Sequence, residues 1–433
     1  MKIFIKFLLL TTLFLTLDAS ILHFKEYKLK GKQKGDTLLV FGGIHGNEPG
    51  GYFAPAILAS HYKVNKGTLI VIPNLNFDSD IRFVRGLYGD MNRKFVKIKK
   101  RDPDFETVKE IKKIILSKKA DLILNLHDGH GFYRKKWENV VFNPKAWGQA
   151  LIIDQMKIDG PKYGNLDKIC KNIVEKVNKS VFNNIHVFHV KNTKTRAKDE
   201  EMRKSLTYFA ITHHQPALAI ETSKNIHDTT TKVFYQLLAI EGFMQNMGIK
   251  YKRDFKLDKK HIKALLKEYG KVKINSRMMI DLTRARSFIN HIPIKLKGNK
   301  FVFSHPLGAP IRKKRYFQLK VGNILVTTIK GDYFKLSNEK PTIEIISNGK
   351  KINATNIFKV KVDKSFIVKA PTNIRVNVIG FTLKNHKNEA NIVIPVNKID
   401  KRYSIYKDLG AYRIEFYDKK NRYIKTIIAE VKD

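Results

Sequence analysis

Short apolar runs alternate with amphipathic segments between residues 36 and 250. The runs that predict strands lie at 37–41, 68–72, 122–126, 140–142 and 217–220, and 185–190 alternates between apolar and polar positions. Helical periodicity covers 49–60, 105–116, 166–177 and 231–247. Strands that alternate with helices are typical of an α/β fold, so we predict a central mixed, largely parallel sheet flanked by helices.

The pattern changes after residue 250. Residues 251–260 are polar and charged and predict a linker, and a predicted helix follows at 261–269. Short strands are then predicted at 301–303, 316–319, 324–329, 343–346, 358–362, 374–381, 390–396, 412–416 and 423–431, with a hairpin turn at Asn348-Gly349. We therefore expect an α/β domain at 21–250, a small β-rich domain at 251–338 and an immunoglobulin-like β-sandwich at 339–433.

Residues 1–20 have the features of a secretory signal peptide. A short basic start precedes an apolar run at 7–17, which is too short to span a bilayer comfortably. We predict cleavage after Ala19 or Ser20 and export to the periplasm, with an uncleaved anchor as the alternative. No later run approaches about 20 apolar residues, so no membrane span is expected after cleavage. Cys170 is the single cysteine, which excludes an internal disulfide framework.

The chain is strongly basic. It has 83 Lys and Arg against 39 Asp and Glu, a formal net charge of +44. Such a charge would suit nucleic acid, but the basic residues are spread along the whole length and no nucleic-acid-binding motif accompanies them. We expect no nucleic-acid partner. A Lys-rich composition explains the charge, and attraction to an anionic wall polymer is the functional alternative.

Candidate metal ligands follow two of the predicted strands. The turn at 42–51 reads Gly-Gly-Ile-His-Gly-Asn-Glu-Pro-Gly-Gly and places His45 and Glu48 three residues apart. His127 lies at the end of the strand predicted at 122–126. Two histidines and one glutamate with an open position form a ligand set typical of catalytic zinc. Asp128 either orients a ligand histidine or caps a turn.

Further polar residues lie where a parallel-sheet site is expected, at the carboxyl ends of strands. Glu221 directly follows the apolar strand at 217–220, where it would serve as a general base beside a metal-bound water. Arg85 and the run containing Asn92 and Arg93 supply groups that polarise a carbonyl or hold a carboxylate in a bidentate pair.

The order of these segments resembles the zinc carboxypeptidase family, whose type member is carboxypeptidase A. Residues 90–95, Asp-Met-Asn-Arg-Lys-Phe, are close to that family's Asp-Leu-Asn-Arg-x-Phe run. The likeness covers about residues 36–250 and does not extend to the β-rich remainder. The residues that carry the resemblance are, in chain order, His45, Glu48, Asn92, Arg93, His127 and Glu221.

The resemblance implies a role for each of these residues. The two histidines and Glu48 would bind zinc, and Glu221 would act first as base and then as acid. Arg85 would stabilise the oxyanion, while Asn92 and Arg93 would hold the terminal carboxylate of the substrate.

Three more residues are candidates for substrate binding. Trp147 either lines the substrate groove or belongs to the core. The segment Leu206-Thr207-Tyr208-Phe209 contains Thr207 and Tyr208, and Tyr208 is a candidate for the tyrosine that covers the substrate in this family.

Within the family the chain is most similar to the periplasmic D,L-carboxypeptidases that determine cell shape in helical Gram-negative bacteria. The signal peptide, the glycine-rich turn at 42–51, the Asn-Pro-x-x-Trp-Gly segment at 143–148 and the β-rich C-terminal region support this likeness. It implies a zinc enzyme that trims the peptidoglycan tripeptide L-Ala-γ-D-Glu-meso-diaminopimelate to a dipeptide. Some of those relatives replace the first ligand by glutamine, whereas this chain keeps His45.

Two other functions remain open. An N-acyl-amino-acid deacylase of the aspartoacylase or succinylglutamate desuccinylase type has a similar Gly-Gly-x-His-Gly-Asn-Glu segment, but such enzymes are cytoplasmic. A non-catalytic protein that binds the cell wall would use the basic surface. The catalytic residue set argues against the second alternative, because a binding protein would not need it. Oligomeric state and protein partners are not predicted.

Overall fold

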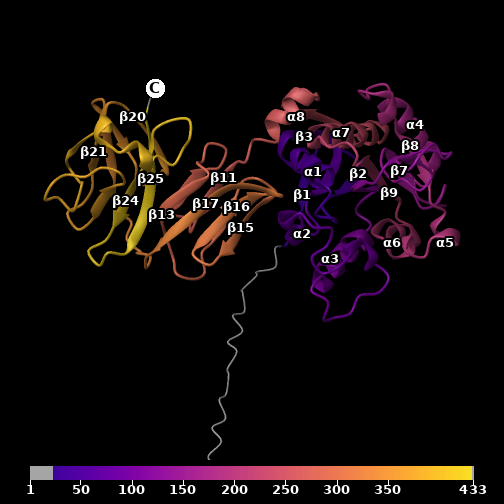
Figure 1. Cartoon of the computed structure of the whole chain (residues 1–433), viewed down its shortest axis with the longest axis horizontal. Coiled ribbons are helices and arrows are strands. Elements are labelled where there is room, and N and C mark those ends of the chain that lie inside the picture. The colour runs from indigo at the N-terminus through magenta and orange to yellow at the C-terminus, as the bar shows by residue number, and fades with distance from the viewer. Residues whose placement is uncertain (1–22, 432–433) are drawn as a thin grey trace, which may run out of the picture.

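The structure is a computed structural model that describes residues 23–431. It has a large α/β body and a β-rich arm that extends from one side of it (Figure 1). The predicted signal peptide lies outside the described residues. None of the helices in the described part of the chain combines the length and hydropathy that crossing a membrane requires.

One mixed sheet of eight strands forms the centre of the α/β body. Its strands are β1 (Tyr27–Lys30), β2 (Gln33–Phe41), β3 (Tyr62–Ile72), β4 (Leu122–Gly129), β7 (Ala150–Ile153), β8 (His189–Asn192), β9 (Ala217–Ser223) and β10 (Lys250–Arg253). The order is β1-β3-β2-β4-β9-β7-β8, and β10 pairs with β3. Strands β3, β2, β4 and β9 are parallel, and β7 is antiparallel to β9. The predicted mixed, largely parallel sheet is therefore confirmed.

Helices cover both faces of this sheet (Figure 1). They are α1 (Pro49–His61), α2 (Phe77–Arg82), α3 (Phe105–Leu116), α4 (Leu166–Asn178), α5 (Thr195–Lys198), α6 (Leu206–Thr212), α7 (Thr229–Asn246) and α8 (Lys259–Leu265), with single 3₁₀ turns η1 (Met91–Arg93), η2 (Asn184–His186) and η3 (Met202–Lys204). Helices α1, α4 and α8 pack against α7, and α6 packs on β9 and β4. The apolar residues of α3 recur every three to four positions because Val108, Ile111 and Ile115 form its buried face.

Some local predictions differ from the structure. Residues 251–260 were predicted as a linker, but Lys250–Arg253 form β10 and α8 begins at Lys259. The strand predicted at 140–142 is reduced to β6 (Phe142–Asn143), which pairs only with β5 (Phe132–Tyr133). Within the central sheet, β1 and β7 also lie where no strand was predicted.

The middle of the chain contains two small sheets. Their strands are β11 (Lys271–Ile274), β12 (Met278–Asp281), β13 (Phe288–Ile294), β14 (Phe301–Phe303), β15 (Gly308–Lys313), β16 (Tyr316–Val321) and β17 (Ile324–Tyr333). The sheet orders are β12-β11-β14 and β13-β17-β16-β15. Apolar residues of these sheets share one buried cluster with Ile405, Tyr406 and Ile428 from the end of the chain, so the middle sheets are packed against the C-terminal region.

Two four-stranded sheets form a sandwich at the C-terminal end. Their strands are β18 (Glu344–Ser347), β19 (Lys350–Asn353), β20 (Lys359–Val362), β21 (Ser365–Lys369), β22 (Arg375–Val378), β23 (Val393–Pro395), β24 (Ala411–Tyr417) and β25 (Tyr423–Val431), with 3₁₀ turns η4 (Val396–Lys398) and η5 (Lys401–Tyr403). The predicted Asn348-Gly349 turn joins β18 to β19, with φ of 50° and 70° at the two residues.

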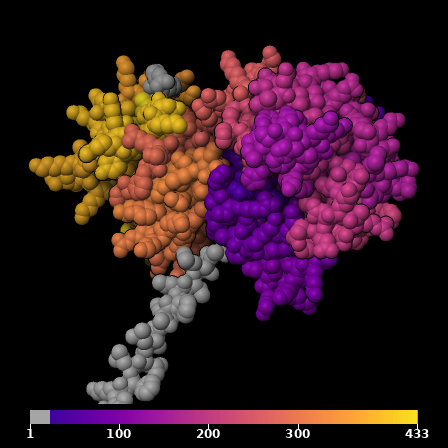
Figure 2. Space-filling model, turned by 45° about the vertical axis from the view of Figure 1, so that its right-hand side comes forward, coloured from indigo at the N-terminus to yellow at the C-terminus, as the bar shows by residue number. Residues whose placement is uncertain are grey.

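The β-rich arm packs directly against the α/β body (Figure 2). Phe77 and Ile81 of α2 share a small apolar cluster with Ala309 of β15, and Lys320 donates a hydrogen bond to the carbonyl of Ile81. Ile262 of α8 belongs to the core of the α/β body. We therefore propose that the first domain ends after α8, later than residue 250.

Candidate metal centre and active site

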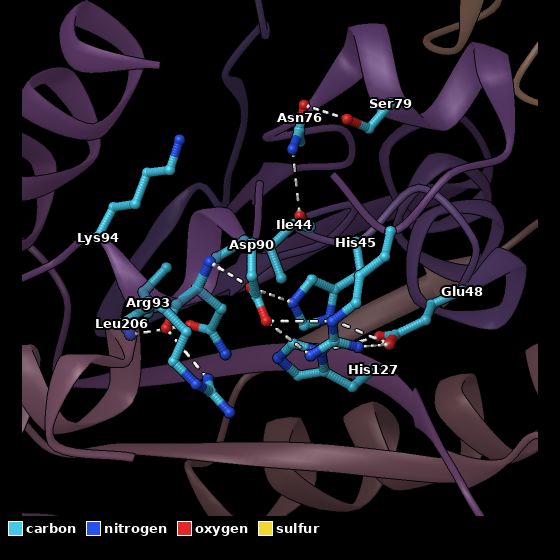
Figure 3. A network of polar contacts seen from close by, with 12 residues as sticks. Ile44, His45, Glu48, Asn76, Ser79, Asp90, Arg93, Lys94, His127 and Leu206 are labelled. Carbon is cyan, nitrogen blue, oxygen red and sulfur yellow. Dashed lines mark hydrogen bonds and ion pairs between the residues drawn. The ribbon is translucent and has the colours of Figure 1, made fainter. Parts of the chain in front are cut away.

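His45, Glu48 and His127 converge in one buried cluster, which we call the triad (Figure 3). The Nδ1 atoms of His45 and His127 lie 3.0 and 2.9 Å from the two carboxylate oxygens of Glu48. The three residues are 3, 3 and 4% exposed, and their ligand atoms lie within 4.8 Å of one another. Two imidazoles and a carboxylate so arranged are suited to one metal ion.

The glycine-rich turn after β2 brings two of these ligands together. A side chain at Gly46 would collide with the backbone of Ser79, since an added Cβ would lie 2.1 Å from the Ser79 carbonyl carbon. Pro49 then begins α1 and leaves Glu48 at its N-cap position. Strand β4, the parallel neighbour of β2, carries His127 to the same end of the sheet.

The other ring nitrogen of each histidine also has a partner. His45 Nε2 lies 2.8 Å from Asp90 Oδ1, and His127 Nε2 lies 2.8 Å from the Asn125 amide nitrogen. Asn125 Oδ1 has no hydrogen-bond partner among the described residues, so a rotated amide would accept the Nε2–H of His127. Both outer nitrogens then donate, which leaves both Nδ1 lone pairs directed at the triad centre. The triad therefore fits a metal ion.

The three residues of the triad shift one another's pKa values. Burial by itself would raise the pKa of Glu48, but His45 and His127 hold that pKa well below its usual range. Burial would lower the pKa of His45, but Glu48 and Asp90 raise it overall. Burial does lower the pKa of His127, and its bond to Glu48 offsets this only in part. An ionised carboxylate beside a neutral imidazole is the form in which both bind metal.

Glu221 lies beside the triad because β9 is the parallel neighbour of β4. The register pairs His127 directly with Glu221, and paired residues of neighbouring strands share a face of the sheet. Burial raises the pKa of Glu221 well above its usual range, and the charges of Glu48 and Asp128 add to this. Lys224 opposes the shift, and its ammonium lies 3.3 Å from Glu48 Oε1.

The predicted arginines border the same site. Arg85 is 44% exposed on its side chain and reaches Glu48 Oε1 at 3.2 Å and Asp90 Oδ2 at 2.9 Å. Asn92 accepts a 2.9 Å hydrogen bond from the Leu206 backbone N–H at the start of α6. Arg93 donates a 3.2 Å hydrogen bond to the carbonyl oxygen of Asn92 (Figure 3). Its Nε atom lies 3.8 Å from a Glu201 carboxylate oxygen.

The three further candidates for substrate binding differ in how they are placed. Trp147 lies next to Gly129 at the end of β4, and the Lys191 ammonium lies 4.0 Å from the centre of its ring. Thr207 is buried and its hydroxyl lies 3.2 Å from Ser205 Oγ, so it faces the interior of the α6 region. Tyr208 is half-buried on α6.

Asp128 has neither of the two roles considered from the sequence. Its carboxylate accepts hydrogen bonds from the Gly50 backbone N–H and the Thr222 hydroxyl, and it pairs with Lys232 at 3.5 Å. It therefore ties β4 to α1, β9 and α7 behind the triad.

Sequence reasoning missed three polar residues of the site. Asp90 stands in the run already quoted for Asn92 and Arg93, and Asn125 lies two residues before His127 on the same face of β4. Those positions were signals that could have identified both. Lys191 carried no comparable signal, because only the sheet order brings β8 near Glu221.

Comparisons with known proteins agree with this site. Residues 1–267 match the family model described as the catalytic part of a carboxypeptidase controlling helical cell shape, and 336–432 match a C-terminal domain of metallo-carboxypeptidase. The solved structure of tripeptide-bound cell shape determinant Csd4 from Helicobacter pylori is 35% identical, covering 94% of this chain and 100% of that chain, with a TM-score of 0.89. The mDAP-bound form of Csd4, described as a D,L-carboxypeptidase, has the same identity and coverage and a TM-score of 0.88. Curated proteins gave no match.

Fold, triad and matches together define a metallo-carboxypeptidase. More narrowly, the chain belongs to the family of carboxypeptidases that control helical cell shape.

Proposed function

We propose that this protein is a periplasmic zinc D,L-carboxypeptidase that removes meso-diaminopimelate from the peptidoglycan tripeptide and so affects cell shape. The observation that carries the proposal is the triad with Glu221 beside it, in a chain that is similar to Csd4 over the whole of that protein. Csd4 has been solved with a tripeptide and with mDAP, which supports stem peptides as the substrate class here. Two imidazoles and a carboxylate favour zinc over harder ions.

The proposed reaction is hydrolysis of the amide between D-Glu and diaminopimelate. A zinc ion bound by the triad would supply a water of lowered pKa and polarise the carbonyl. Glu221 accepts the proton of the attacking water at its carboxylate and then delivers it to the departing amine. A raised pKa lets this carboxyl group keep the accepted proton at neutral pH until the amine departs. Arg85 donates hydrogen bonds to the carbonyl oxygen as negative charge develops on it.

Arg93 and Asn92 account for the preference for a chain end. The Arg93 guanidinium would pair with the α-carboxylate of the departing residue, and Asn92 is fixed beside it by Leu206. An internal peptide has no carboxylate at this place, so it would leave that arginine without its anion. The enzyme therefore acts as an exopeptidase.

The other two functions have less support. The chain is similar to a D,L-carboxypeptidase over 94% of its length, and its C-terminal part also matches a metallo-carboxypeptidase domain. A non-catalytic wall binder would gain nothing from a buried triad whose outer nitrogens both have partners. The predicted signal peptide supports the periplasmic location, and the net charge of +44 would favour an anionic wall.

The test uses the mature protein, beginning near residue 21, and purified muropeptides from dipeptide to pentapeptide. We expect mass spectrometry to show loss of one diaminopimelate from the tripeptide alone, and we expect a chelator to abolish that loss. Glu221→Gln should lower kcat/KM by roughly 10²- to 10⁴-fold because it removes the general base. Glu175→Gln, at an exposed carboxylate of α4, is the matched control.

Zinc content separates the outcomes that would contradict the proposal. Hydrolysis of no muropeptide by zinc-loaded protein would favour the deacylase. A protein that neither binds zinc nor hydrolyses peptide would favour the wall binder.

A further inference from the structure

The four-stranded sheet β13-β17-β16-β15 of the arm differs in charge from the rest of the chain. Residues 282–331, which contain most of this sheet, include eleven Lys and Arg but no Asp or Glu. At the chain's average of 39 acidic residues in 433, a segment of that length would contain about four. A Lys-rich composition explains the many cations but not the absence of anions, so this sheet has a charge pattern of its own.

One face of the sheet combines cations with two exposed aromatic rings. In one cross-strand row, Tyr316 pairs with Lys313 on one side and with Lys330 on the other. Phe288 pairs with Thr328, which lies two residues before Lys330 and therefore on the same face. The rings of Phe288 and Tyr316 lie 5.8 Å apart, and these residues are 43 and 38% exposed. We call this surface the basic face and define it by Phe288, Lys313, Lys314, Arg315, Tyr316 and Lys330.

The cations of the basic face have no acidic partners. Lys313, Lys314 and Arg315 are exposed at the tip of the β15–β16 hairpin. Among residues 23–431, no carboxylate forms an ion pair with them or with Lys330. Unpaired cations around exposed apolar rings are suited to a partner that is anionic and also offers some apolar surface.

The basic face extends toward the active site. In Figure 2 the orange surface of this sheet meets the indigo surface of the α/β body, where Lys320 bonds to the carbonyl of Ile81. Burial lowers the pKa of Lys320, and the nearby positive charges of Arg82 and Lys313 lower it further. Arg82 ends α2, and Arg85, three residues later, reaches the triad. A series of cations therefore leads from the hairpin to the loop that carries Arg85.

We propose that the basic face binds polymeric peptidoglycan through the carboxylates of stem peptides that neighbour the one in the active site. The choice of partner rests on the proposed function, because an enzyme that trims stem peptides meets them attached in series to glycan strands. Each tripeptide stem has more carboxylates than amines, so such a strand is a polyanion. The sugar rings between the stems offer apolar faces to Phe288 and Tyr316.

The experiment measures how the mature zinc-loaded protein sediments with purified sacculi of a Gram-negative bacterium. Two quadruple variants, each with four positive charges fewer, are compared with the wild type. The basic-face variant carries Lys313→Gln, Lys314→Gln, Arg315→Gln and Lys330→Gln. The matched control changes four exposed lysines of the C-terminal sandwich that also form no ion pair with any described residue, and it carries Lys350→Gln, Lys351→Gln, Lys364→Gln and Lys369→Gln.

The two variants have the same net charge, so a difference between them depends on where the charges lie. The basic-face variant should bind sacculi roughly 10- to 100-fold more weakly than the wild type, because each exposed charge pair contributes about two- to threefold and four are removed. The control should bind within about threefold of the wild type. Conversion of the carboxylates of the sacculi to neutral amides should remove the difference between the wild type and the basic-face variant. All three proteins should have the same kcat/KM on the soluble tripeptide.

Four outcomes would overturn the inference. Equal binding of the two variants to sacculi would show that only net charge matters, and a wild-type protein that does not sediment with sacculi would show that no such binding exists. A basic-face variant that loses affinity only for vesicles of phosphatidylglycerol and phosphatidylethanolamine would show that the face binds lipid. An equal loss of tripeptide hydrolysis and of binding would show that these residues support the fold.

The proposed function can fail separately. A wild-type protein that binds sacculi through the basic face but hydrolyses no muropeptide would support the inference and contradict the proposed function itself.

Discussion

Replacement of Asp90 by asparagine tests whether the carboxylate behind His45 supports the metal centre. Asp90 Oδ1 lies 2.8 Å from His45 Nε2 and accepts a 2.9 Å bond from the Asn92 backbone N–H. Its other oxygen accepts two bonds from Arg85, at 2.9 and 3.1 Å. Asp90→Asn keeps the size of the side chain but removes the charge, and its amide nitrogen would face either His45 or Arg85 as a second donor.

The expected effect is a loss of metal affinity. Groups that orient a ligand histidine in this way typically contribute 10- to 100-fold to metal affinity, or about 1.4 to 2.8 kcal/mol. Burial would raise the pKa of Asp90, but the bond to His45 and the charges of His45 and Arg85 hold it well below the usual range. The carboxylate is therefore ionised at every pH at which the histidines can bind metal. The loss of metal affinity in Asp90→Asn should then be the same between about pH 6 and pH 8, on either side of the ordinary histidine pKa of about 6.5.

The assay is competition for zinc between the protein and a chromophoric chelator, with wild type, Asp90→Asn and Asp102→Asn compared at equal concentration. Asp102 is the matched control because its side chain is 24% exposed, as is that of Asp90, and it pairs with Lys94 rather than with a ligand. A dissociation constant for Asp90→Asn within twofold of the wild-type value would refute the reasoning. An equal loss in Asp102→Asn would refute it too, since the effect would then not depend on contact with His45.

Two further predictions concern other buried or charged groups. Arg93→Lys keeps the charge but loses the bidentate geometry of the guanidinium. We expect kcat/KM on the tripeptide to fall roughly 10- to 100-fold, mainly because KM rises. An unchanged kcat/KM would exclude Arg93 as the group that binds the substrate carboxylate. Asp80 is fully buried and burial raises its pKa well above the usual range, so wild-type stability should fall as pH rises above about 3.9, where the unfolded chain releases the proton. The free energy of unfolding, measured with denaturant at pH 5 and pH 7.5, should therefore differ less between the two pH values in Asp80→Asn than in the wild type. An equal difference in both proteins would contradict this prediction.

Local sequence patterns predicted most of the α/β body but failed at its edges. Residues 251–260 were predicted as a linker, yet Lys250–Arg253 form β10. An edge strand of this kind exposes alternate residues and needs no apolar run, because backbone hydrogen bonds to β3 hold it in place. Strand β7 was missed for a different reason, since Ala150–Ile153 are only four residues long and entirely buried.

The sequence by itself determined which residues are candidate metal ligands and that they lie at the ends of strands. His45 and Glu48 are fixed by a short turn, and a spacing of three residues is readable without a structure. His127 and Glu221 could be assigned because each directly follows an apolar run, and the carboxyl ends of parallel strands meet at one edge of a sheet.

Only the tertiary structure decided which groups surround these ligands. The partners of the outer ring nitrogens, Asp90 and Asn125, depend on side-chain orientation, and Asp128 faces away from the triad although it is next to His127. The position of Lys191 depends on strand order, because β8 follows β7 in the sheet and β9 joins them only later in the chain. The spacing of residues in the sequence predicts contacts within a turn or a strand. Contacts between strands depend on how the residues of two strands pair, and neither strand alone specifies that register.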